Sequence, residues 1–270
     1  MFSPVERLRS DDAEIFYEIR GDGPPVVLFH PFPCHREFWY PVAAALDSRY
    51  RLILPDLRGH GDSEIGEGPA LMQKHAGDIA RVLDAAGIGK AAFVGCSIGG
   101  YILFEFWRRF RARVTSLGLC DTRPQADTVE ARANRLKAAD TVLEQGTELF
   151  IESMIPKLMG RTTVTMRPDL VDGARAMMRK MSAEDISLVQ RGMAERPDSV
   201  ADLKTINVPT LIVIGEEDVL STVADGERMR QNIAGSQLKV IPKAGHYAPW
   251  EQPEAVGTVL RQFLDEVAAK

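Results

Sequence analysis

Short apolar runs alternate with segments of helical periodicity along most of the chain. The apolar runs are rich in β-branched and aromatic residues and predict strands at 26–29, 51–54, 91–94, 114–119, 210–214 and 237–241. The segments between them repeat apolar positions every three or four residues and predict helices over 36–46, 73–86, 98–109, 224–234 and 253–268. Strands that alternate with helices indicate an α/β protein whose mostly parallel central sheet has helices on both faces.

Two regions depart from this alternation. Residues 5–9 and 13–20 flank Ser10-Asp11-Asp12 and predict an antiparallel hairpin. Between 122 and 204 only helical patterns occur, over 127–145, 147–159, 168–182 and 183–195. We therefore expect a core made of residues 1–121 and 205–270, with a helical cap at 122–204 inserted after the sixth strand. Such a cap would cover the carboxyl ends of the strands, where open α/β sheets bind ligands.

A candidate nucleophile lies where the strand at 91–94 meets the following helix. Gly95-Cys96-Ser97-Ile98-Gly99 is a G-x-S-x-G sequence in the strand–turn–helix setting that lifts a serine hydroxyl clear of its neighbours. Gly95 and Gly99 stand where a Cβ atom would collide as the helix folds back over the strand. The sequence therefore predicts Ser97 as the nucleophile.

A serine needs a base to remove its proton and a third group to orient that base. Of the five histidines, His246 follows the strand at 237–241 and is predicted to lie on a loop at the same sheet edge as Ser97. His30 and His60 also follow strands, and His60 lies in a Gly-rich turn that favours a packed, hydrogen-bonded imidazole. His35 and His75 fall in or near helices. We take His246 as the base.

Two aspartates compete for the role of the acid. Asp218 follows the strand at 210–214 and gives the chain order Ser, Asp, His, whereas Asp121 follows the strand at 114–119. Asp218 is preferred on that order. Asp121 is then expected to brace loops beneath the cap.

The oxyanion that develops during acyl transfer needs backbone donors. The Ile98 N–H opens a helix and has no partner within it, so it is one predicted donor. The second is the Phe32 N–H, because Pro31 and Pro33 on either side have none.

Composition limits the classes of function. The chain is 45% hydrophobic and 26% charged, with a net charge of −5, which gives no electrostatic reason to expect nucleic acid or an anionic membrane as partner. No apolar run is long enough to span a bilayer, and the first residues lack the pattern of a signal peptide. Three cysteines without metal-type spacing fit a reduced, cytoplasmic setting.

The chain resembles the α/β-hydrolase superfamily over essentially its full length. The resemblance rests on Gly95–Gly100, on the loop Pro55-Asp-Leu-Arg-Gly-His-Gly-Asp-Ser63 and on Gly245-His-Tyr-Ala-Pro-Trp-Glu-Gln-Pro253. The strand–helix turn at Gly95–Gly100, called the elbow below, and Cys120-Asp-Thr-Arg123 are most similar to one branch of the family. That branch holds 3-oxoadipate enol-lactonases, small carboxylesterases and cofactor-free haloperoxidases. This resemblance implies a triad of Ser97, His246 and Asp218 that works without metal or organic cofactor.

One position departs from the family pattern. The loop His30-Pro31-Phe32-Pro33, called the oxyanion loop below, contains the predicted Phe32 donor. The family usually has glycine directly after the histidine of this loop, and this chain has Pro31. Proline fixes φ near −65°, so we expect a differently shaped oxyanion hole, with a carbonyl turned towards the site.

The sequence thus predicts a serine hydrolase of small carboxylic esters or lactones. Two alternatives stay open: a perhydrolase or haloperoxidase that uses the same triad with hydrogen peroxide in place of water, and a small-molecule receptor of hydrolase fold. Arg123, at the start of the cap, is either a partner for a substrate carboxylate or a tie between cap and core.

Overall fold

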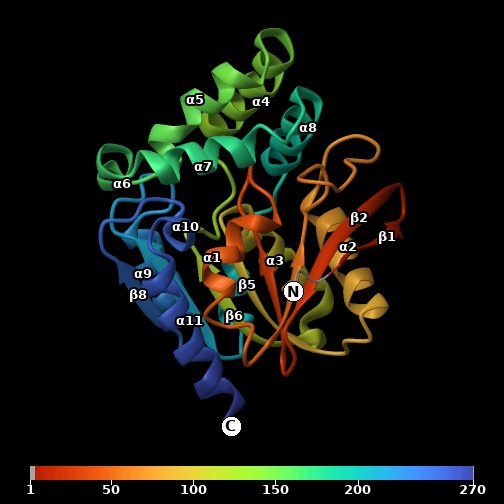
Figure 1. The fold of residues 1–270 in the computed structure, drawn as a ribbon, viewed down its shortest axis with the longest axis vertical. Coiled ribbons are helices and arrows are strands. Elements are labelled where there is room, and N and C mark those ends of the chain that lie inside the picture. The colour runs from red at the N-terminus through yellow and green to blue at the C-terminus, as the bar shows by residue number, and fades with distance from the viewer. Residues whose placement is uncertain (1–3, 270) are drawn as a thin grey trace.

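A computed structural model describes residues 4–269 (Figure 1). Its sheet has eight strands in the order β1-β2-β4-β3-β5-β6-β7-β8. β1 pairs antiparallel with β2 and β2 with β4, and all the other pairs are parallel. The strands are β1 (Val5–Ser10), β2 (Ala13–Arg20), β3 (Pro25–Phe29), β4 (Arg51–Pro55), β5 (Ala91–Cys96), β6 (Val114–Cys120), β7 (Thr210–Gly215) and β8 (Gln237–Ile241). The predicted hairpin and mostly parallel sheet are confirmed.

Helices cover both faces of the sheet. The core helices are α1 (Tyr40–Ala43), α2 (Met72–Ala85), α3 (Ile98–Phe110), α9 (Val223–Asn232), α10 (Ala248–Glu251) and α11 (Pro253–Ala268). Successive side chains of a strand point to opposite faces. Phe93 accordingly packs in the cluster that contains α2, α3 and α9, whereas Ala92 and Val94 pack in the cluster that contains α1 and α11.

Five α-helices are inserted between β6 and β7, where the sequence predicts a helical insert of four. They are α4 (Val129–Gln145), α5 (Thr147–Leu158), α6 (Arg161–Met166), α7 (Pro168–Met178) and α8 (Ala183–Ala194). Of these, α6 is the one that was not predicted. In Figure 1 they form a separate layer at the top, beyond one end of the sheet. We propose that residues 122–204 act as a cap domain over the core, 1–121 and 205–270.

The helix expected over 36–46 is shorter and partly of another type. Residues Arg36–Trp39 form a 3₁₀ turn, and an α-helical segment follows only over Tyr40–Ala43. The Tyr40 N–H bonds to the Glu37 carbonyl, three residues back. Pro41 has no N–H with which to continue that ladder, which explains the break.

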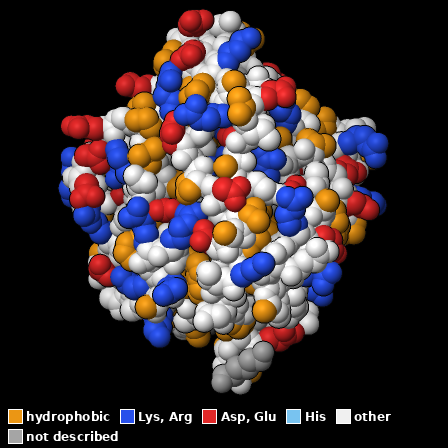
Figure 2. All heavy atoms as spheres, turned by 180° about the vertical axis from the view of Figure 1, so that it is seen from behind, with side chains coloured by type: hydrophobic (Ala, Val, Ile, Leu, Met, Phe, Trp, Pro, Cys, Tyr) orange, Lys and Arg blue, Asp and Glu red, His pale blue; other side chains and the backbone are white. Residues whose placement is uncertain are grey.

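The surface carries mixed charge on the face that Figure 2 shows, where basic and acidic side chains are interspersed. Among residues 4–269, no helix combines the length and apolar character that crossing a membrane requires.

Candidate active site

Ser97 occupies the turn between β5 and α3 in a strained conformation. Its backbone has φ 55° and ψ −114°, a region that residues with a Cβ atom rarely adopt. The strain is held by neighbours: the Ser97 N–H donates to the Cys120 carbonyl at 3.0 Å, and the Thr122 hydroxyl donates to the Ser97 carbonyl at 2.8 Å. Adjacent strands thus fix the turn that presents the hydroxyl.

The two glycines of the turn are required by close approach. A Cβ atom on Gly95 would lie 2.5 Å from the Gly99 carbonyl carbon, and one on Gly99 would lie 2.7 Å from the Phe29 carbonyl oxygen. Both contacts are with backbone atoms, which cannot swing away as a flexible side chain can. The collision expected from the sequence is therefore present at both positions.

Gly95→Ala is expected to lower the free energy of unfolding by about 3 kcal/mol or more, because the new methyl group overpacks a rigid turn. Gly77→Ala is the matched control, since Gly77 lies inside α2 and an added Cβ there meets no atom within 4 Å. That variant is expected to gain about 0.5–1 kcal/mol from helix propensity. Urea unfolding of both proteins measures the contrast, and equal stabilities would contradict this account of the elbow.

The structure brings Ser97, His246 and Asp218 together. The Ser97 Oγ lies 2.7 Å from His246 Nε2, and His246 Nδ1 lies 2.8 Å from Asp218 Oδ2. The other carboxylate oxygen of Asp218 accepts the N–H groups of Leu220 and Ser221 at 2.7 and 3.0 Å. These bonds fix the carboxylate so that Oδ2 faces the imidazole. All three side chains are buried, with Ser97 the most exposed at 8%.

Asp121 is not hydrogen-bonded to the imidazole of His246 and instead connects two loops of the site. Its Oδ1 accepts the Gly215 N–H at 2.8 Å, and its Oδ2 accepts the Ala248 N–H at 3.1 Å. Burial, and then the nearby charge of Asp218, raise the pKa of the Asp121 carboxyl well above its usual range. Asp121 therefore joins the end of β7 to the segment that follows His246.

The oxyanion loop is anchored by His30. His30 Nε2 accepts the Leu57 N–H at 2.9 Å, so Nδ1 carries the proton and donates to the Pro31 carbonyl at 3.0 Å. Burial holds the pKa of His30 well below its ordinary value. Both nitrogens are thus occupied, which removes His30 as a base.

Proline at position 31 leaves the loop carbonyls bonded to protein donors. The Pro31 carbonyl also accepts the Cys34 N–H at 3.0 Å, and the Phe32 carbonyl accepts the Tyr247 hydroxyl at 2.9 Å. Both carbonyls thus accept protein donors, and a carbonyl turned towards the site stays an expectation. The N–H groups of Phe32 and Ile98 donate to no acceptor within residues 4–269, as the predicted oxyanion donors require.

The other histidines are packing residues. His60 is buried, its Nδ1 donates to the Arg58 carbonyl at 2.9 Å, and burial lowers its pKa to about 4. His35 and His75 are also buried.

Two glutamates hold the site loops in place, and one of them, Glu251, is not predicted as a site residue from the sequence. Buried Glu251 accepts the N–H groups of Gly245 and Tyr247 with Oε1, at 2.9 and 3.2 Å, and that of Gly160 with Oε2 at 2.8 Å. It therefore fixes both sides of His246 and ties them to the cap. Its place five residues after the histidine is the one signal that the sequence offered.

Glu217, next to Asp218, makes a second tie between cap and core. Its carboxylate accepts the N–H and the hydroxyl of Thr162, at 2.8 and 2.5 Å, at the beginning of α6. Helix N-termini favour such anions.

Among the described residues, no cluster of three His, Cys, Asp or Glu side chains could hold a metal ion.

Comparison with known proteins gives the relationships of the chain. An esterase from Thermogutta terrifontis, whose structure contains malate, is 37% identical and superimposes with a TM-score of 0.94, over 98% of this chain and 99% of the other. 3-Oxoadipate enol-lactonase 1 of Acinetobacter baylyi is 29% identical over 91% of this chain and 90% of its own length. A putative non-heme bromoperoxidase of Mycobacterium tuberculosis is 27% identical over 94% and 98%.

The family of the chain is shown by the match of a family model to its sequence. The family model described as the alpha/beta hydrolase fold covers residues 24–253, which include the elbow, the inserted helices and His246. The chain therefore belongs to the α/β-hydrolase family and is related to esterases and enol-lactonases.

Proposed function

We propose that the protein hydrolyses small carboxylic esters or lactones through an acyl-enzyme on Ser97. The observation that carries this proposal is the continuous chain from the Ser97 hydroxyl through His246 to Asp218, at 2.7 and 2.8 Å. A serine with this support is an activated nucleophile. The relationship to esterases and to an enol-lactonase supports the same reaction class.

In the first step the Ser97 Oγ attacks the ester carbonyl while His246 Nε2 takes its proton. Asp218 holds the Nδ1 proton and stabilises the imidazolium that forms. His246 then returns a proton to the departing alcohol, or to the ring oxygen of a lactone, and the acyl group stays on Ser97. Water, deprotonated by His246, releases the acid in the second step.

The N–H groups of Phe32 and Ile98 are the proposed donors to the oxyanion. Ile98 is the first residue of α3, so the helix dipole adds to its N–H. Each donor of this kind contributes about 3 kcal/mol to the stabilisation of the transition state.

The alternative is perhydrolysis by the same triad, and the similarity of the chain to a putative bromoperoxidase supports considering it. The Phe32 carbonyl is bonded to the Tyr247 hydroxyl, and the Pro31 carbonyl to two other donors. These carbonyls are therefore already occupied and are poor acceptors for a hydrogen bond from hydrogen peroxide. We therefore favour water over peroxide as the second nucleophile.

The test combines turnover with labelling. Purified protein is assayed on p-nitrophenyl esters from acetate to octanoate, with and without hydrogen peroxide, and is then treated with diethyl p-nitrophenyl phosphate. We expect ester hydrolysis without peroxide, and one p-nitrophenolate released per chain as a diethylphosphoryl group bonds to Ser97 Oγ. Peptide mass spectrometry locates the adduct. No turnover and no adduct would overturn the proposal, and peroxide-dependent peracid formation exceeding hydrolysis would favour the alternative.

A further inference from the structure

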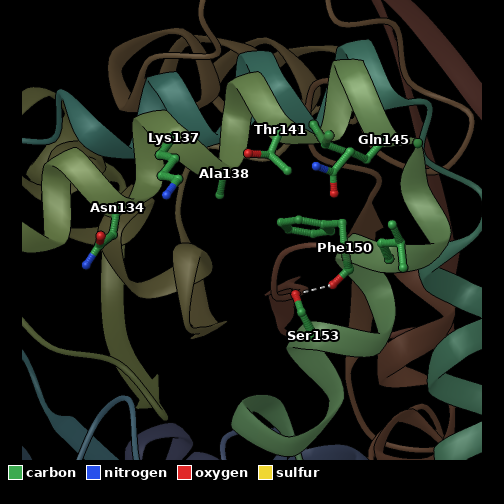
Figure 3. A pocket seen from close by; sticks show the side chains of 10 residues that line it. Asn134, Lys137, Ala138, Thr141, Gln145, Phe150 and Ser153 are labelled. Atoms are coloured by element: carbon green, nitrogen blue, oxygen red, sulfur yellow. Dashed lines mark hydrogen bonds between the residues drawn. The ribbon is translucent and has the colours of Figure 1, made fainter.

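A cavity of about 310 Å³ lies in the cap between α4 and α5 (Figure 3). Asn134, Ala138, Thr141 and Gln145 lie along one stripe of α4, at helical spacing, and line one wall. Lys137 lies on the same side, and Figure 3 shows its side chain extending from α4 into the cavity. This wall therefore carries three polar side chains and one positive charge, with apolar Ala138 and Val142 among them.

The opposite wall, formed by α5, is mostly apolar, and one of its rings contacts the oxyanion loop. Leu149 and Phe150 of α5 line it, and Leu149 is exposed although it is apolar. The Phe150 ring stands edge-on to the Phe32 ring, with their centroids 6.0 Å apart. Phe32 and Phe150 belong to the same hydrophobic cluster as Ile98. One aromatic pair thus separates the cavity from the backbone that we assign to the oxyanion.

Lys137 is the one charged side chain that lines the cavity. Several neighbouring charges of the cap pair with each other, in Asp140–Arg191, Glu148–Arg179, Glu152–Arg175, Arg132–Glu195 and Arg135–Asp127. Lys137 makes no ion pair within residues 4–269. Arg123 is the cation that we considered from the sequence for a substrate carboxylate. Its guanidinium lies 3.6 Å from Asp127 Oδ1, and this ion pair joins two residues of the cap.

We propose that this cavity binds a substrate chain that ends in a carboxylate, with Lys137 as its counter-ion. The methylene chain runs along the Phe32–Phe150 pair and packs against Leu149, and the carboxylate meets the Lys137 ammonium on the α4 wall. This inference rests on the proposed ester hydrolysis at Ser97, and it names the substrate class as esters or lactones with an anionic tail.

The test uses two pairs of esters that differ only at the end of a four-methylene chain. On the acyl side, the mono-p-nitrophenyl ester of adipic acid is compared with p-nitrophenyl hexanoate. On the alcohol side, 5-acetoxypentanoate is compared with pentyl acetate. Lys137→Gln is expected to lower kcat/KM for the anionic member of at least one pair about threefold, and Lys137→Glu about tenfold. The neutral members should change less than twofold, and salt should weaken the preference of the wild type.

Lys157→Glu is the matched control, because Lys157 is an exposed lysine of α5 that does not line the cavity. It makes the same change in net charge and should leave all four esters unaffected. An unchanged ratio of anionic to neutral kcat/KM in Lys137→Glu, for both pairs, would overturn the inference while leaving ester hydrolysis standing.

A binding measurement keeps the two proposals separate should no ester be turned over. Equilibrium dialysis of adipate against the wild type and Lys137→Glu needs no catalysis. We expect weaker binding to the variant, and equal binding by both proteins would overturn the anionic subsite.

Discussion

Ser97→Ala is expected to lower kcat for p-nitrophenyl ester hydrolysis by about 10⁴- to 10⁶-fold, since a triad without its nucleophile keeps only binding and oxyanion contacts. The structure supports an effect of this size because His246 Nε2 lies 2.7 Å from Ser97 Oγ. No other hydroxyl group among the described residues is hydrogen-bonded to His246 Nε2. Steady-state kinetics on the ester with the best chain length measures the loss.

The control removes the same atom from another buried serine. Ser116 lies in β6, is fully buried, and its hydroxyl has no partner within residues 4–269. Ser116→Ala should therefore fold and keep activity within about twofold, because it deletes no hydrogen bond. Activity in Ser97→Ala within tenfold of the wild type would mean that another group is the nucleophile.

The sequence was sufficient for the parts of the site that secondary structure dictates. A strand that ends in Gly95-Cys96-Ser97 and continues as a helix leaves few conformations for the serine. Asp218 and His246 each follow a parallel strand, and parallel strands end at one sheet edge, so the topology brings their loops together. The strand–helix alternation likewise predicted the sheet and the position of the inserted helices.

The remaining features depend on contacts between segments far apart in the chain. Glu251 bonds to Gly160, 91 residues away, and Glu217 bonds to Thr162 across the same boundary. No local period encodes such pairs. The cavity at Lys137 also depends on how α4 crosses α5, which the periodicity of each helix leaves undetermined.

The second large effect distinguishes the two aspartates. Asp218→Asn is expected to lower kcat by about 10⁴-fold, because an amide in this position reverses the tautomer of the histidine. Asp218 Oδ1 accepts two backbone N–H groups, so the amide oxygen of asparagine must take that place. The amide nitrogen then faces His246 Nδ1, which has to accept rather than donate. The proton moves to Nε2, and Nε2 can no longer accept from Ser97.

Asp121→Asn makes the same chemical change beside the same loops, and here we expect less than a tenfold loss of kcat. Its carboxylate bonds only to the N–H groups of Gly215 and Ala248, and an amide oxygen retains one of the two. The N–H group that loses its acceptor is expected to lower the stability of the fold rather than kcat. Steady-state kinetics of both variants, with circular dichroism to verify folding, decides the matter. If Asp121→Asn were the inactive variant, the acid would lie after β6, and the bond between Asp218 and His246 would have a structural role only.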